Sequence, residues 1–401
     1  MLSTHDISII KSTVPVLEVH GKDITTCFYK MLFEHHPELL NIFNHANQKK
    51  GKQQAALANM VYAAAKYIDQ LEVVLPAVKE VAQKHRSLGV LPEHYPIVGK
   101  YLLIAIKEVL GDAATDEIIH AWNNAYGVIA SVFIDIEKEM YEEAEGQQGG
   151  WTGFRPFTVS KIVEENELIR SFYLIPSDGG AIASFTPGQY VSVKVQVPGE
   201  TYTQIRQYSL SAAPHEPYYR ISVKRENGAL NTPDGKVSNY LHNVIKEGDK
   251  LLLSAPAGEF KMELTDDRPV VFIGGGIGVT PLMSMMNTAV KQQPNRQVTF
   301  IHAAHNGKVH AMGSEVKQLE DANEQVTTHF CYSNPLPEDT GYSKTGRIDQ
   351  AWLQEIVPTT DAHFYFCGPL SFMKSIRDSL ISWGVREEDL HYEFFGPKET
   401  L

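Results

Sequence analysis

The spacing of apolar and polar positions changes twice along the chain. Up to residue 143, apolar side chains recur at intervals of three and four, as in ALANMVYAAAKYI and IVGKYLLIAIKEVL, which predicts amphipathic or buried helices. Residues 141–153, YEEAEGQQGGWTG, are polar and rich in glycine, so they are expected to form a linker.

Two other patterns of apolar and polar residues follow this segment. Short β-rich runs such as QYVSVKVQV and YRISVKRE are separated by Gly, Pro and Asp turns, and then apolar strands such as PVVFIG and AHFYFCG alternate with helical stretches. The second alternation is typical of a parallel α/β sheet. The sequence therefore predicts an all-α domain over 1–143, an antiparallel β-barrel over 152–264 and an α/β domain with a parallel sheet over 268–401.

Composition and charge argue against certain classes of binding partner. The formal net charge is −12, from 36 basic and 48 acidic residues among 401, and this argues against nucleic acid or an anionic membrane as a partner. No run of 18 apolar residues predicts a membrane span, and the N-terminus lacks the pattern of a signal peptide. Cys27, Cys331 and Cys367 are scattered, which fits a reducing compartment, so we expect a cytoplasmic protein.

His85 occupies a position where a helix should bury an apolar side chain. In LPAVKEVAQKH, it shares one helix face with Val78, Val81 and Ala82. One interpretation is a core histidine that is hydrogen-bonded to a carbonyl group. The other is an axial haem ligand, because such a ligand is a neutral imidazole held in an apolar pocket.

Residues on other predicted helices favour the second interpretation. Gln53 lies on one face with Leu57 and Val61, while Tyr29 and Phe43 belong to preceding segments. Two polar side chains, Tyr29 and Gln53, beside apolar Phe43 and Leu57 would suit a small pocket that hydrogen-bonds a diatomic ligand. Together with His85 they resemble a globin, with a distal Tyr and Gln, an aromatic wedge and a proximal His.

The run RQYSL at 206–210 follows β-rich sequence and resembles the flavin motif of the ferredoxin-reductase superfamily. The guanidinium of Arg206 can neutralise a diphosphate with a forked set of donors. Tyr208 offers a ring and a hydroxyl to the isoalloxazine, and Ser209 can hydrogen-bond its edge. Tyr190 would pack on the adenosine side, and Gln207 is included in the predicted FAD site.

The run PVVFIGGGIGVTPLMSMM leads from an apolar strand through glycines into a helix. Glycines permit a positive φ and close approach of a phosphate. Thr280 suits the N-cap of the helix and Pro281 its first position. The turn resembles the G-x-G-x-T-P turn of ferredoxin-reductase-type NAD(P)H domains, so the predicted contacts are Gly276, Ile277, Gly278, Val279, Thr280 and Pro281. The next strand ends in HAAHNGK, without an acidic residue or an Arg that would indicate NADH or NADPH.

These motifs, taken together over nearly the whole chain, resemble the flavohaemoglobin family. The resemblance implies one haem b, one FAD, NAD(P)H as electron donor and a monomer. It implies that Tyr95 and Glu137 support His85, giving the imidazole partial imidazolate character. Lys84 either tunes electron flow or is a solvated helix position. The segment 227–236, with LNTPDG, looks like an insertion.

The resemblance also assigns the C-terminal segments. Cys367 and Gly368 stand at the carboxyl end of a strand, where open α/β sheets bind ligands, and are predicted to lie near the nicotinamide. In HYEFFGP, Glu393 is expected to tune the flavin potential and Phe395 to cover the flavin ring. The predicted flavin-side segment is Glu393, Phe394, Phe395, Gly396 and Pro397.

The function implied is that of a nitric oxide dioxygenase. NAD(P)H reduces FAD, FAD reduces the haem iron, and ferrous haem with O2 oxidises NO to nitrate. Two alternatives remain open on the sequence alone. One is a haem-based O2 sensor or oxygen carrier, and the other is an NAD(P)H-dependent flavin or ferric reductase.

Overall fold

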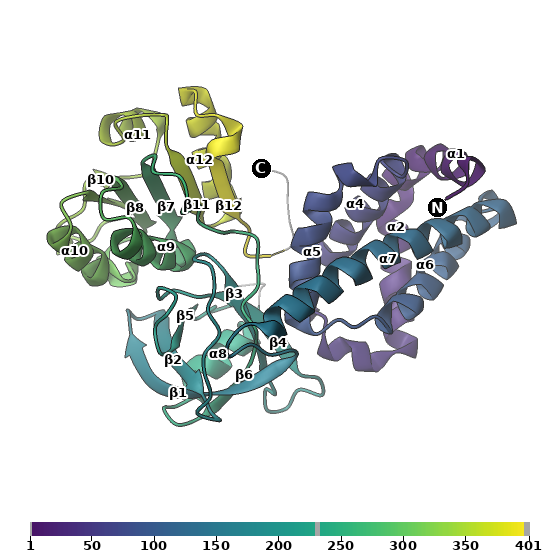
Figure 1. The fold of residues 1–401 in the computed structure, drawn as a ribbon, viewed down its shortest axis with the longest axis horizontal. Coiled ribbons are helices and arrows are strands. Elements are labelled where there is room, and N and C mark those ends of the chain that lie inside the picture. The colour runs from purple at the N-terminus through teal and green to yellow at the C-terminus, as the bar shows by residue number, and fades with distance from the viewer. Residues whose placement is uncertain (1, 229–232, 397–401) are drawn as a thin grey trace. The chain divides into compact units, whose positions relative to one another are not determined.

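The computed structural model describes residues 2–228 and 233–396 (Figure 1). It contains two compact units, one made of residues 1–154 with 194–206 and the other of residues 155–193 with 207–401. Part of the predicted insertion at 227–236 lies outside the described residues. The three domain boundaries expected from the sequence remain predictions.

The N-terminal part is all-helical, as predicted (purple to blue in Figure 1). In it α2 packs against α4 and α6, and α5 packs against α7. Its elements are α1 Thr4–Ser12, α2 Val14–His35, η1 Pro37–Asn41, α3 His45–Lys49, α4 Lys52–Lys66, η2 Leu71–Val73, α5 Leu75–Leu88, α6 His94–Leu110, η3 Gly111–Ala113 and α7 Asp116–Gly146.

Helix α7 is longer than the sequence predicted. The Thr115 side chain caps it by accepting from the Ile118 N–H at 3.3 Å, and Asp116 and Glu117 lie in the first turn, where acidic residues favour a helix start. The helix continues to Gly146. The prediction that 141–153 is a linker is therefore wrong for residues 141–146, because Glu and Ala are good helix formers there.

The middle part forms a six-stranded antiparallel sheet in the order β4-β3-β6-β1-β2-β5. A bridge between Leu210, which follows β4, and Ile221 in β5 joins the two ends of this order, as in a barrel. The elements are β1 Phe154–Glu164, β2 Ile169–Pro176, β3 Tyr190–Val195, β4 Gln204–Ser209, β5 Tyr219–Lys224, α8 Lys236–Asn243 and β6 Lys250–Ser254.

The C-terminal part is a parallel sheet in the order β10-β9-β8-β7-β11-β12, again as predicted. Its elements are β7 Val270–Gly275, η4 Gly276–Gly278, α9 Val279–Gln292, β8 Val298–Ala304, η5 Gly307–Val309, α10 Gly313–Ala322, β9 Val326–Tyr332, β10 Lys344–Thr345, α11 Gln350–Ile356, β11 His363–Cys367, α12 Leu370–Trp383, η6 Glu387–Asp389 and β12 Leu390–Glu393.

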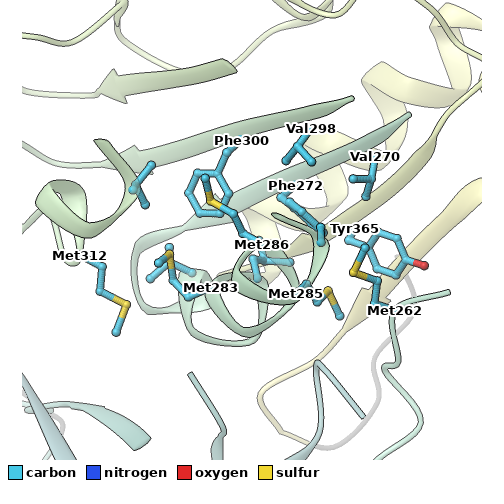
Figure 2. Close-up of a cluster of buried hydrophobic side chains, with 14 of the residues drawn as sticks. Met262, Val270, Phe272, Met283, Met285, Met286, Val298, Phe300, Met312 and Tyr365 are labelled. Atoms are coloured by element: carbon cyan, nitrogen blue, oxygen red, sulfur yellow. The ribbon is translucent and has the colours of Figure 1, made fainter. Parts of the chain in front are cut away.

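Helices cover both faces of this sheet, so successive residues of its strands are buried. Along β7, Phe272 joins a cluster with residues of α9 and α10, whereas Ile273 joins one with residues of α11 and α12. Figure 2 shows the first cluster, in which Met283 and Met286 of α9 pack with the ring of Phe300. This buried core fixes the glycine turn between β7 and α9. Among the described residues, no helix is both long and apolar enough to cross a membrane.

Candidate functional site

His85 lies in the last turn of α5, whose end is firmly anchored. Gly89 caps the helix in the left-handed conformation, with φ of 79°, which a residue with a Cβ adopts only with strain. The hydroxyl of Tyr141 on α7 donates to the carbonyl of Val90 at 2.8 Å. Val78, Val81 and Ala82 were predicted to share a helix face with His85. In the structure these three residues belong to one apolar cluster.

The structure brings His85, Tyr95 and Glu137 together. Nδ1 of His85 is 2.7 Å from Oε1 of Glu137, and the hydroxyl of Tyr95 donates to the same oxygen at 2.6 Å. A carboxylate oxygen accepts, so Nδ1 of His85 carries the hydrogen, and Nε2 is the ring nitrogen with the free lone pair. This tautomer is the one that a metal-binding imidazole needs.

Burial strengthens this arrangement. Glu137 is 3 % exposed, so its carboxylate depends on the two donors in place of water. Burial, together with the neighbouring Glu137 carboxylate, raises the pKa of Tyr95, so that side chain remains a hydroxyl donor. The His85 side chain is 31 % exposed, in contrast to its partner. Lys84, next to it, is partly exposed, and its role stays a prediction.

Aromatic residues that the sequence analysis missed complete this side. The ring of Phe133 lies 5.8 Å from that of His85, centroid to centroid, and 6.2 Å from that of Tyr95. The hydroxyl of Tyr126 donates to the carbonyl of Tyr95 at 2.6 Å. A Cβ at Gly99 would lie 2.4 Å from the Tyr126 ring, so a glycine is needed there. The apolar periodicity of α7 marked these rings as core but did not indicate their neighbour.

The predicted ligand-binding side is also assembled around Tyr29. Its ring meets that of Phe43 edge-on, with 5.7 Å between centroids, and Phe33 packs against both. Burial raises the pKa of Tyr29 well above the usual range, so its hydroxyl stays protonated at neutral pH. Leu57 belongs to the same apolar cluster, as predicted.

Gln53 lies on α4, which crosses α2 closely. The Thr25 hydroxyl, one turn before Tyr29, donates to the Gln54 carbonyl at 2.9 Å, and a Cβ on Gly21 would touch Ala58. Oε1 of Gln53 is buried and has no hydrogen-bond partner among the described residues. An unpaired buried amide oxygen is costly unless a ligand or water meets it, so this side of the helical domain fits a polar ligand.

The apolar core of the helical domain suits a flat group held by His85. It consists of two clusters, one containing Tyr29 and the other Tyr95 and Phe133, and both include Leu71, Tyr126 and Ile129 at their margins. An apolar macrocycle held by His85 needs an apolar lining of the kind that these two clusters supply. The residues present therefore fit haem, with one imidazole ligand and a polar pair for a diatomic ligand.

The predicted flavin residues lie on β4, an end strand of the antiparallel sheet. Arg206 and Tyr208 alternate with Gln207, so they share one strand face, and Gln207 donates from Nε2 to the Ser192 hydroxyl at 3.0 Å. All three are partly exposed, whereas Ser209 is buried. A guanidinium and a phenol side by side on a partly exposed face fit a flavin diphosphate and ring.

Tyr190 begins β3 and is held by main-chain bonds in both directions with Ala257. Its ring is buried, and a Cβ on Gly258 would lie 3.0 Å from it. This close approach explains the glycine, which has a φ of +117°. The contact of Tyr190 with adenosine remains a prediction.

The glycine turn lies at the carboxyl edge of the parallel sheet, as predicted, but its helix begins earlier than expected. Gly278 is the N-cap of α9, so Thr280 is not. The Thr280 hydroxyl instead donates to the Ile277 carbonyl at 3.1 Å, and Pro281 stands at the third helical position. The 3-10 turn Gly276–Gly278 brings the helix start forward. Val279, Thr280 and Pro281 are buried, so only the main chain of this helix start can reach a ligand.

Two glycine turns meet at this edge. A Cβ on Gly278 would lie 2.2 Å from the carbonyl oxygen of Cys367, and one on Gly368 would lie 2.7 Å from the Phe372 ring. Both positions therefore require glycine, which places the ends of β7 and β11 in close contact. Nothing lies within 4 Å of a Cβ built on Gly276, so the turn is open there. The turn is thus tightly packed at Gly278 and Gly368 and open at Gly276, an arrangement that fits the phosphates of a dinucleotide.

Cys367 is fully buried, and burial raises the pKa of its thiol far above the ordinary value. Its Sγ donates to the carbonyl of Glu393 at 3.4 Å, so it is no nucleophile. Phe395 is 52 % exposed, an unusual position for a large aromatic residue and one that suits a cover for a ring. Phe394 and Gly396 are described beside it, and Pro397 lies outside the described residues.

Comparison with protein families agrees with this assignment of a haem, an FAD and a nucleotide site to successive parts of the chain. A globin model matches residues 26–133, an oxidoreductase FAD-binding domain matches 157–262 and an oxidoreductase NAD-binding domain matches 272–378. The predicted cofactor classes, haem, FAD and a nicotinamide nucleotide, are confirmed at this level.

Full-length relatives share the whole arrangement. A flavohemoprotein of Bacillus cereus is 58 % identical over an alignment of 404 positions that covers 100 % of both chains, and one of Bacillus subtilis is 51 % identical over 100 % of this chain and 99 % of the relative. The crystal structure of a Malassezia yamatoensis flavohemoglobin with bound FAD and haem has a TM-score of 0.86 at 28 % identity, covering 98 % of this chain and 100 % of that one.

The FAD/NAD-binding domain of a Vibrio cholerae nitric oxide dioxygenase is 40 % identical to part of the chain, with a TM-score of 0.56. It covers 61 % of this chain and 99 % of that one. Because identity above half extends over the full length of a curated relative, and because each domain has its own matching family model, the chain belongs to the flavohemoprotein family, oxidoreductases that join a globin to an FAD- and NAD-binding module.

Proposed function

We propose that the protein is a nitric oxide dioxygenase, which converts two NO and two O2 with one NAD(P)H to two nitrate ions, NAD(P)+ and a proton. Haem would supply the iron at which O2 and NO react, and FAD would convert the two-electron hydride into single electrons. The observation that carries the proposal is the carboxylate-supported imidazole of His85 in the same chain as a reductase. The relative from Vibrio cholerae, named a nitric oxide dioxygenase, supports it.

His85 would hold the iron through Nε2. Glu137 accepts the Nδ1 hydrogen at 2.7 Å and Tyr95 donates to the same oxygen, so the ring is fixed in position and in tautomer. A buried carboxylate also makes the imidazole a stronger electron donor than a carbonyl partner would. This favours a role in oxygen activation over reversible oxygen storage.

Tyr29 and Gln53 would orient the diatomic ligand. The Tyr29 hydroxyl is kept protonated by burial, so it can donate a hydrogen bond, and Gln53 brings an amide whose N–H groups would donate to the ligand. Phe43 packs against the ring of Tyr29 and would limit the room for a ligand beside the hydroxyl. A donor in an apolar pocket interacts strongly with a partly charged ligand because water is excluded.

The reductase residues would bind and orient the two nucleotides. Arg206 would neutralise the FAD diphosphate, and Tyr208 and Ser209 would contact the flavin ring. The main chain of Gly276, Ile277 and Gly278 would bind the phosphates of NAD(P)H, with Cys367 and Gly368 beside the nicotinamide. Phe395 would cover the flavin until the nicotinamide replaces it.

We propose NO and O2 as the substrates and a cytoplasmic monomer as the working form. Cys27, Cys331 and Cys367 are all free thiols, which supports a reducing compartment. The net charge of −12 opposes non-specific binding to nucleic acid.

The test compares NADH oxidation by the haem- and FAD-loaded protein in air, with and without NO. A dioxygenase consumes NADH much faster when NO is added, in proportion to the NO supplied. An oxygen carrier or sensor would show the same slow oxidation in both conditions. A flavin or ferric reductase would respond to an added ferric chelate and not to NO, and either outcome would overturn the proposal.

A further inference from the structure

A buried histidine in the NAD-binding domain is hydrogen-bonded to the main chain of the glycine turn. His302 lies in β8 opposite Gly274 of β7 and is 0 % exposed. Its Nε2 is 2.9 Å from the carbonyl oxygen of Gly276, the first residue of the turn. A carbonyl only accepts, so Nε2 of His302 carries the hydrogen and donates it. Burial lowers the pKa of His302 to about 4, so the ring is neutral at physiological pH.

This hydrogen bond fixes the direction of a main-chain donor. The Gly276 carbonyl and the Ile277 N–H belong to one trans peptide, in which C=O and N–H point in opposite directions. Drawing the carbonyl toward His302 therefore turns the Ile277 N–H away from it. The φ of Gly276 is +55°, and a Cβ there would meet nothing within 4 Å, so the turn is open at this residue.

The side chain of His310 lies next to the His302 ring, and that of Tyr332 lies next to His310. The ring of His310 lies 4.8 Å from that of His302, and its Nδ1 is 2.7 Å from the hydroxyl of Tyr332. Burial raises the pKa of Tyr332 and lowers that of His310 to about 3, so all three side chains are neutral. Nδ1 of His302 and Nε2 of His310 are buried without hydrogen-bond partners among the described residues.

Nδ1 of His302 and Nε2 of His310 become an acceptor and a donor, respectively, when the hydroxyl of Tyr332 donates to Nδ1 of His310. His310 then carries its hydrogen on Nε2, while Nδ1 of His302 is an acceptor, so one buried water could join them. With such a water in place, donors would run in one direction from Tyr332 through the two imidazoles to the Gly276 carbonyl. Such a chain exceeds what packing requires, because two apolar rings would fill this interior without buried nitrogens.

We propose that His302 is a positioning residue for the phosphates of the nicotinamide nucleotide, acting by holding the Gly276 peptide so that its N–H faces the ligand, with His310 and Tyr332 fixing its ring. The inference deepens the proposed function in its nucleotide-binding part only. It does not depend on NO as a substrate.

The test uses the haem- and FAD-loaded protein and measures ferricyanide reduction with two hydride donors. NADH carries a diphosphate, whereas dihydronicotinamide riboside carries no phosphate. His302→Leu is expected to raise KM for NADH roughly tenfold with little change in kcat, because one buried hydrogen bond to the turn is lost. With the riboside, kcat/KM should stay within about twofold of the parent, since no phosphate is bound.

Two amide variants supply matched controls. Gln can place an amide donor near the position of Nε2, so His302→Gln should keep KM for NADH within about threefold of the parent. Asn has the same chemistry but a shorter reach, so His302→Asn should behave like His302→Leu. This pair decides the question even if the Leu variant does not fold.

An equal loss with both hydride donors would mean that His302 supports the domain only as packing, and the proposal would fail. An unchanged KM for NADH in the Leu and Asn variants would overturn it as well. Neither assay contains NO, so failure here is distinguishable from failure of the dioxygenase proposal.

Discussion

His85 in the helical domain and His302 in the NAD-binding domain are histidines for which we propose opposite uses. His85 donates from Nδ1 to a carboxylate and keeps Nε2 for a ligand, whereas His302 donates from Nε2 to a main-chain carbonyl. The side chain of His85 is 31 % exposed, and His302 is 0 % exposed. The partner therefore decides the role, because it selects which nitrogen carries the hydrogen.

The difference also lies in what each partner does to the ring. In the proposed function Glu137 would increase the electron density of His85, as a metal ligand requires, and Tyr95 donates to the same carboxylate oxygen. The Gly276 carbonyl does not have this effect, and His302 serves to fix the main chain. A histidine is thus a metal-ligand candidate when a carboxylate accepts the hydrogen of one ring nitrogen, as Glu137 does for His85.

The largest expected effect comes from removing the His85 imidazole. His85→Ala should abolish haem binding, while FAD content and NADH-dependent ferricyanide reduction remain, because the reductase residues belong to other domains. Absorption spectra of the purified variant measure both cofactors. His302→Leu is the matched control and should keep a full Soret band. A Soret band of undiminished intensity in His85→Ala would refute the ligand assignment.

The next effect concerns the Tyr29 hydroxyl. Tyr29→Phe keeps the ring that packs on Phe43 and removes only the donor. A hydrogen bond to a charged acceptor contributes roughly 1.5–3 kcal/mol, so O2 should leave the reduced protein about ten to a hundred times faster. Stopped-flow measurement of O2 release checks this. A rate within about twofold of the parent would mean that the hydroxyl points away from the ligand.

A smaller effect is expected when the carboxylate beside His85 becomes an amide. Glu137→Gln keeps the size of the side chain and should retain haem, but it weakens electron donation by the imidazole. NO-dependent turnover should fall about tenfold, and the iron–histidine stretching frequency of the ferrous protein should decrease. Tyr95→Phe should change both quantities in the same direction by less. An unchanged stretching frequency in Glu137→Gln would mean that the contact is only structural.

The smallest effect is on stability in acid. Burial lowers the pKa of His302 and His391 to about 4 and that of His310 to about 3, while unfolded imidazoles titrate near 6.5. Below pH 6.5 the unfolded chain binds more protons, so stability is fully present above this value and falls as the pH approaches 4. The loss by pH 4 is on the order of a few kcal/mol for each histidine.

Calorimetric unfolding from about pH 7.5 to 5 measures this loss, with release of flavin as the signal of the reductase part. His302→Gln removes one of the three titrations, so its melting temperature should depend less on pH than that of the parent. Identical pH profiles for the two proteins would show that this histidine does not contribute to acid sensitivity.

The sequence was sufficient to predict the fold class, whereas the roles of the site residues remain predictions. Apolar periodicity separated helices from strands, and the phase of Val78 with His85 placed the imidazole on a core-facing side, as the structure has it. The glycine turn was located correctly because its spacing follows from the geometry of a strand that leads into a helix.

Other features depend on contacts that local patterns do not encode. The cap of α9 is Gly278 and not Thr280, because a 3-10 turn brings the helix start forward. Helix α7 runs through the predicted linker as far as Gly146. His302 was missed because its partner, the Gly276 carbonyl, lies in the 3-10 turn that follows the neighbouring strand β7, although a histidine within an apolar strand was a signal.

The most direct test of the central claim is the yield of nitrate per NADH consumed, measured with the loaded protein under limiting NO in air. The account predicts about two nitrate ions for each NADH, as the balanced reaction requires, with Glu137→Gln slower but with the same ratio. NADH consumption without nitrate, or with nitrite or nitrous oxide as the main product, would contradict it.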